Sequence, residues 1–178
     1  MRKNPLLFLY VTVVHNTQMT NHELTFSKIK ELLESHFPEN ISEFEDGTHL
    51  TLDSEDEEES SIWIELDQDG QLTVGFGISH LHYDPKYDDL NKGFNKFLLF
   101  LTCKKRRVDY YKGKFRFKNE YEFENRNGTW ENYGTASTWA LPFWRKTIKK
   151  TITQNGFINY TEIESEIEKI KSTMHNKV

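Results

Sequence analysis

One stretch of the chain decides the fold: IWIELDQDGQLTVGFGISHLHYDPKYDDLNKGFNKFLLFLTC, residues 62–103. Its first five residues are mostly apolar, with β-branched and aromatic side chains among them, and this composition predicts a strand. Asp69 and Gly70 form one of the strongest short signals for a hairpin turn. Residues 71–83 are therefore expected to run back as one partner strand, which makes this half of the stretch an antiparallel hairpin.

The second half of the stretch predicts a helix. Asp84 offers an N-cap carboxylate and Pro85 suits the first helical position. The helix is expected to reach about Cys103, and the basic residues 104–107 suit its negative C-terminal end. One apolar stripe follows its length and is expected to be buried against the sheet: Tyr87, Leu90, Phe94, Phe97, Leu98 and Leu101.

Two further helices are predicted outside this stretch. Residues 24–37 repeat apolar side chains at helical spacing, with Thr20 or Asn21 as the cap and Pro38 at the end. Residues 160–174 predict a closing helix, because Thr161 stands three residues before Glu164, as in a capping box.

The remaining segments predict strands. These are residues 48–52, 108–111, 115–123 and 139–152, the last interrupted by Pro142, while the Asn- and Gly-rich residues 125–134 predict a loop. Apolar and charged side chains alternate in residues 115–123, which is typical of an antiparallel sheet with one wet face. The sequence therefore predicts an α+β fold, a mainly antiparallel sheet packed by two or three helices.

Length and composition predict a single α+β domain over residues 1–178. Cys103 is the one cysteine, so an intramolecular disulfide and a multi-cysteine zinc site are excluded. The apolar residues 6–14 are too short to span a bilayer and no small-residue cleavage site follows them. We interpret residues 1–18 as a peripheral strand. The alternative is that Met19 is the true start and residues 1–18 are a start-site artefact.

A short histidine cluster is the one candidate for chemistry. If His80 and His82 end a strand, their side chains project from the same face, and Asp84 continues that face. Two imidazoles and a carboxylate suit zinc, manganese or iron. The competing interpretation is an N-cap aspartate beside two histidines on a polar strand face. The metal site is the alternative, and no cofactor is the main expectation.

Charge is distributed unevenly along the chain, although its total is −5. Residues 31–85 contain sixteen acids and no Lys or Arg, whereas residues 104–118 contain eight basic residues and one acid. The two signs could face each other across the sheet or decorate a solvated surface. The functional interpretation is an acidic face that receives a basic protein partner. The residues that would bind this partner form a run: Glu55, Asp56, Glu57, Glu58 and Glu59.

Aromatic side chains crowd into residues 130–144 and predict either sheet core or an interface: Trp130, Tyr133, Trp139, Phe143 and Trp144. Basic neighbours could suit single-stranded nucleic acid. The net negative charge argues against nucleic acid as a partner.

Residues 63–66, 69–70, 72–77 and 80–84 carry a family resemblance, in the order Trp-Ile-Glu-Leu, Asp-Gly, Leu-Thr-Val-Gly-Phe-Gly and His-Leu-His-Tyr-Asp. Over about residues 62–103 the chain resembles immunity-type proteins found with bacterial polymorphic toxins, and their uncharacterised relatives. The resemblance implies a cytoplasmic, non-catalytic inhibitor that binds a cognate toxin. No association with a membrane is expected, because the apolar run of residues 6–14 is too short to span one. We therefore expect an immunity-like, protein-binding module, with a metal-dependent enzyme as the alternative.

Overall fold

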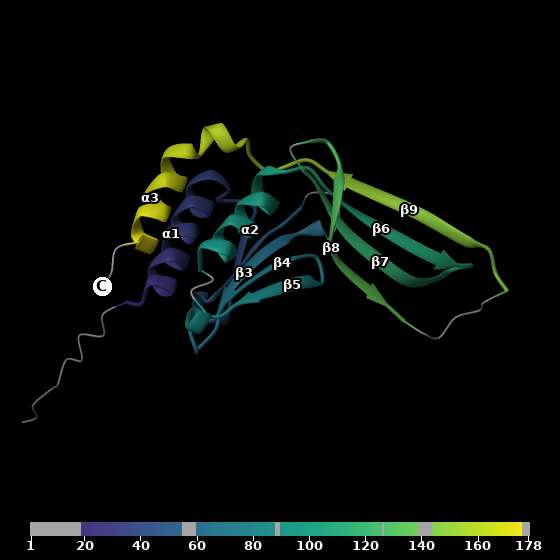
Figure 1. Ribbon diagram of the computed structural model, residues 1–178, viewed down its shortest axis with the longest axis horizontal. Coiled ribbons are helices and arrows are strands. Elements are labelled where there is room, and N and C mark those ends of the chain that lie inside the picture. The colour runs from purple at the N-terminus through teal and green to yellow at the C-terminus, as the bar shows by residue number, and fades with distance from the viewer. Residues whose placement is uncertain (1–18, 55–59, 88–89, 126, 139–143, 176–178) are drawn as a thin grey trace, which may run out of the picture.

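The computed structural model describes residues 19–54, 60–87, 90–125, 127–138 and 144–175 (Figure 1). Its helices and antiparallel sheets confirm the predicted α+β class. The strands form two sheets rather than one, and the second extends away from the helices. The strand expected within residues 1–18, and with it the choice between Met1 and Met19, lies outside the described residues.

Sheet A has five strands in sequence order, every neighbouring pair antiparallel. They are β1 (Ile41–Phe44), β2 (His49–Leu52), β3 (Ile62–Leu66), β4 (Leu72–Phe76) and β5 (Ser79–Tyr83). The single strand expected over residues 71–83 was wrong, because the chain reverses between β4 and β5. Phe76 pairs with Ser79 there, and Gly77 takes the left-handed φ of 58° that such a tight turn requires.

Two helices pack on one face of sheet A, and a third helix packs against both of them (Figure 1). Helix α1 (Asn21–His36) begins with a capping box: Thr20 Oγ1 accepts from the Glu23 backbone N–H, and the Glu23 carboxylate accepts from the Thr20 N–H. Helix α3 (Glu164–His175) follows a 3₁₀ turn, η4 (Tyr160–Glu162), so Thr161 lies within that turn and is not the cap.

Helix α2 (Leu90–Thr102) starts later than predicted. Asp84 accepts from the Lys86 backbone N–H, but the turn it begins is a separate 3₁₀ segment, η3 (Pro85–Tyr87). Tyr87 is 67% exposed, so its place in the buried stripe was wrong. The other five members of the stripe are buried, as predicted: Leu90, Phe94, Phe97, Leu98 and Leu101.

Sheet B has the strand order β8-β7-β6-β9, all antiparallel. Its strands are β6 (Lys105–Lys112), β7 (Phe115–Glu124), β8 (Trp130–Ser137) and β9 (Thr147–Gln154). The loop predicted over residues 125–134 ends early, because Trp130 already begins β8. Residues 105–107, expected to flank a helix end, belong to β6. The predicted strand over residues 139–152 is described only from residue 144 onwards.

The two sheets join through the end of sheet B nearest the helices. Phe76 of β4 packs edge-on against Tyr121 of β7, with ring centroids 5.2 Å apart. Tyr133 of β8 donates its hydroxyl hydrogen to the Val74 carbonyl at 2.9 Å. The junction is therefore part of the main core, whereas the far end of sheet B stands clear of it (Figure 1).

Candidate functional site

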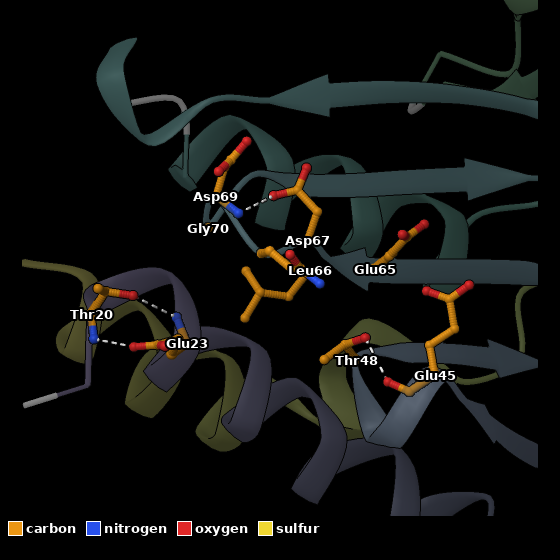
Figure 2. Close-up of a pocket in the computed structure, with 10 residues that line it drawn as sticks. Thr20, Glu23, Glu45, Thr48, Glu65, Leu66, Asp67, Asp69 and Gly70 are labelled. Carbon is orange, nitrogen blue, oxygen red and sulfur yellow. Dashed lines mark hydrogen bonds between the residues drawn. The ribbon is translucent and has the colours of Figure 1, made fainter. Parts of the chain in front are cut away.

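A hollow of about 610 Å³ opens where the N-terminus of α1 meets the β3–β4 turn (Figure 2). We call it the acidic hollow, because half of its lining side chains are carboxylates and none is Lys or Arg. The lining comes from three separate parts of the chain: Thr20, Glu23, Glu45, Thr48, Glu65, Leu66, Asp67, Gln68, Asp69 and Gly70.

The β3–β4 turn fixes one wall of the acidic hollow. Asp67 Oδ1 accepts from the backbone N–H groups of Asp69 and Gln71, at 3.0 and 2.9 Å. Gly70 N–H donates to the Asp67 carbonyl, and Gly70 has a φ of 78°. The hairpin is confirmed, but its loop is a turn followed by a left-handed glycine rather than a two-residue turn at Asp69 and Gly70. The carboxylate of Asp67 is thus structural, and that of Asp69 is exposed.

The opposite wall carries Glu45 in a left-handed conformation, with a φ of 53°. This region is sparsely populated for residues with a side chain. Here the Thr48 backbone N–H and hydroxyl both donate to the Glu45 carbonyl, at 3.3 and 2.9 Å. The 3₁₀ turn η1 (Glu45–Gly47) that joins β1 to β2 therefore presents Glu45 at the mouth of the hollow (Figure 2).

Little positive charge from the described residues reaches the acidic hollow. Lys30 lies nearby but pairs with Glu43, with its Nζ 2.6 Å from the carboxylate oxygen. His49 Nδ1 lies 3.6 Å from Glu65 Oε2, and it is charged only when protonated. The hollow therefore concentrates negative potential between protein walls, an arrangement that attracts cationic groups.

Charge is also segregated over the whole molecule. Residues 104–154, which include all of sheet B, hold 13 Lys and Arg against 5 Asp and Glu. The rest of the chain holds 10 against 23. The acidic hollow lies at the N-terminus of α1. Sheet B extends away from the helices (Figure 1). The molecule thus has an acidic body and a basic sheet.

The predicted partner-binding run, Glu55 to Glu59, lies outside the described residues. In the sequence it falls between β2 and β3. Asp53, just before the run, accepts from the hydroxyls of Ser42 and Ser61. The acidic hollow itself was not predicted. The absence of Lys and Arg from residues 31–85 was its one sequence signal.

The predicted histidine pair lies on β5, on the face of sheet A that the helices do not cover. The rings of His80 and His82 project from the same face, with centroids 5.0 Å apart. His82 Nδ1 lies 2.8 Å from Thr73 Oγ1, while Asp84 is engaged with the Lys86 N–H. Among the described residues, no group of three or more His, Cys, Asp or Glu side chains is gathered to hold a metal ion.

The aromatic cluster of residues 130–144 is divided between core and surface. Tyr133 packs against the core, with its ring centroid 4.5 Å from that of Phe100. Burial raises the pKa of its hydroxyl. Trp130 stacks with the Arg106 guanidinium at 4.1 Å, whereas Trp144 is 84% exposed. Trp139 and Phe143 lie outside the described residues.

Comparison with protein-family models, with curated proteins and with solved structures returned no match. In the described ranges, no helix is both long and apolar enough to cross a membrane. The resemblance to immunity-type proteins over residues 62–103 is therefore an expectation from the sequence.

Proposed function

We propose that this chain is a non-catalytic, protein-binding module whose acidic hollow receives basic side chains of a partner protein. The carrying observation is the hollow itself, with five carboxylates in its lining and no Lys or Arg. Together with the sequence resemblance, this supports an immunity-like inhibitor that binds a basic toxin in the cytoplasm. The acidic run of residues 55–59 would add to the attraction for a basic partner.

The chemistry of the hollow suits this role. Carboxylates that are held by local hydrogen bonds accept Arg or Lys without first being ordered, so less conformational entropy is lost on binding. Complementary fields also accelerate encounter and reject partners of the wrong sign. The proposal therefore expects a partner with a protruding basic segment and an association rate that depends strongly on salt.

Charge reversal tests the proposal. Partners captured from the source cells would be measured for binding kinetics at two ionic strengths. In Glu45→Lys/Asp69→Lys, which changes two exposed side chains of the hollow, we expect the association rate to fall roughly tenfold or more. Its salt dependence should flatten, because steering by the hollow is lost. Stability should change little, since exposed charges contribute little to it.

Two matched variants sharpen the test. Glu31→Lys/Glu34→Lys makes the same charge change on exposed positions of α1 outside the hollow, and it should leave the association rate near that of the wild type. Glu55→Lys/Glu57→Lys/Glu58→Lys measures how much the acidic run contributes to the association rate. Association rates that are equal in all four proteins at both ionic strengths would refute the proposal.

A metal-dependent activity at His80 and His82 is the second candidate. This candidate is favoured by the closeness of the two rings, whose centroids lie 5.0 Å apart. The Thr73 contact also orients the His82 ring and leaves Nε2 to bind a metal. In calorimetric titration with zinc or manganese, we expect the wild type to bind and His80→Ala/His82→Ala to lose binding. His36→Ala is the control, because His36 lies on α1. Identical isotherms for wild type and the double variant would eliminate this candidate.

A further inference from the structure

The far end of sheet B is a surface that the proposed function does not use. We call it the basic tip and define it as residues 110–118 and 144–150, from β6, β7, their turn and the start of β9. These two ranges contain no Asp or Glu. Their cations are numerous and come from both segments: Lys112, Lys114, Arg116, Lys118, Arg145, Lys146, Lys149 and Lys150.

The two segments of the basic tip are held together by specific contacts. Lys112 Nζ donates to the Arg145 carbonyl at 2.8 Å. The Arg145 guanidinium lies over Gly113, where a Cβ atom would come within 2.4 Å of Nη1. Gly113 also has a φ of 66°, which favours glycine. The turn between β6 and β7 and the chain leading into β9 therefore form one surface.

Aromatic rings are interleaved with these cations. Tyr110 of β6 pairs across the sheet with Lys118 on one side and with Lys149 on the other. Both ammonium groups lie over its ring, 5.0 and 5.5 Å from the centroid. Phe115 is 43% exposed, and Trp144 is among the most exposed large side chains described. Bare aromatic rings beside cations give stacking surfaces next to sites for phosphate.

We infer that the basic tip binds single-stranded nucleic acid. The cations would track the phosphates and Trp144 and Phe115 would stack on bases. The net charge of −5 does not oppose this, because the negative charge is concentrated outside residues 104–154. The acids of the neighbouring part of β7 are already engaged, Glu120 with Lys118 and Glu122 with Arg106.

A single strand suits this surface better than a duplex does. The tip presents three neighbouring strands, β7, β6 and β9, which at about 4.8 Å spacing span roughly 10 Å before side chains are added. The major groove of B-DNA, about 12 Å wide, admits a helix or a two-stranded ribbon. Stacking on Trp144 also requires a base that is not already stacked within a helix.

The test is fluorescence anisotropy with labelled oligouridine and oligothymidine of about 12 nucleotides, and with a duplex of the same length. We expect the intact chain to bind the single strands more tightly than the duplex, with an affinity that falls steeply between about 50 and 200 mM salt. Trp144→Ala should weaken binding about 5- to 100-fold. Lys146→Ala/Lys149→Ala/Lys150→Ala should also weaken it and flatten the salt dependence. A difference between the two oligonucleotides would identify RNA or DNA as the preferred strand.

The controls have the same chemistry elsewhere on the surface. Tyr87→Ala removes another exposed ring, and Lys86→Ala/Lys92→Ala/Lys169→Ala removes three exposed cations. Both should bind like the wild type. The inference is overturned if no oligonucleotide binds at low salt, or if Trp144→Ala binds as tightly as the wild type. It is also overturned if the tip variants alter self-association of the protein, measured by sedimentation, but leave oligonucleotide binding unchanged. The tip would then contact an acidic protein surface rather than nucleic acid.

Discussion

Replacing Asp109 with Ala is expected to lower the free energy of unfolding by about 3–5 kcal/mol. Asp109 of β6 is fully buried, and Arg107 on the same strand is 5% exposed. Arg107 Nε lies 3.2 Å from the Asp109 carboxylate, and Arg116 Nη1 approaches it at 3.8 Å. Without the carboxylate, a buried guanidinium loses a close counter-charge. Urea unfolding followed by circular dichroism measures the loss.

A double variant separates the pair from its surroundings. In Arg107→Met/Asp109→Leu both charges are replaced by apolar side chains, so most of the lost stability should return, because no buried charge remains. A double-mutant cycle of the wild type, Arg107→Met, Asp109→Leu and the double variant then gives the coupling between the two residues. A loss below about 1 kcal/mol in Asp109→Ala would mean that the pair is not a significant source of stability.

The second large effect concerns pH and the buried Lys105. Its side chain is fully buried beneath the C-terminus of α2, where Nζ donates to the carbonyls of Phe100 and Asn155 at 3.0 and 3.2 Å. The ring of Phe157 covers it at 4.4 Å. Burial lowers the pKa of Lys105 to about 7, and the neighbouring Cys103 opposes that change.

The sign of the pH effect follows from this lowered pKa. Between about pH 7 and the ordinary lysine pKa of 10.5, the unfolded chain holds a proton that the folded chain has released. Stability should therefore rise with pH across this range, by at most ~1.4 kcal/mol per unit from this group. Below about pH 7 both states are protonated, and the contribution to the slope disappears.

Lys105→Met removes the titrating group and should remove this slope. Lys104→Met is the matched control, because Lys104 is the exposed neighbour and should leave the slope as it is. Groups shared by all three proteins cancel when their unfolding curves are compared between pH 6 and about pH 9.5. Equal slopes in wild type and Lys105→Met would show that Lys105 keeps its proton when folded.

Local patterns predicted those elements in which periodicity and turn residues agree. The β3 strand and the buried stripe of α2 follow directly from alternation and helical spacing in residues 62–103. The turn at Gly77 was missed because Ile78, beside it, is a strand-forming residue and no Asn or Asp marks the reversal. β8 was missed because residues 125–134 are rich in Asn and Gly. Pairing with β7 makes a strand of that segment from Trp130 onwards.

The candidate sites depend on tertiary structure in different degrees. Period-two alternation correctly placed His80 and His82 on one face, since that requires only a strand. The acidic hollow needs α1, η1 and the β3–β4 turn to meet, and Glu23, Glu45 and Asp69 are far apart in sequence. The basic tip likewise depends on β9 pairing with β6 across an interval of more than thirty residues. No local pattern specifies such meetings.

The position of β9 has a consequence for colloidal behaviour. β9 is the outer strand of its sheet, and among the described strands it pairs only with β6. An outer strand with unused backbone donors and acceptors is a template on which another chain can add, the first step of amyloid-like growth. Lys149 and Lys150 are consecutive and so project from opposite faces of the strand. An incoming copy therefore meets an ammonium group whichever face it approaches. Polymerisation through this edge strand is disfavoured for that reason.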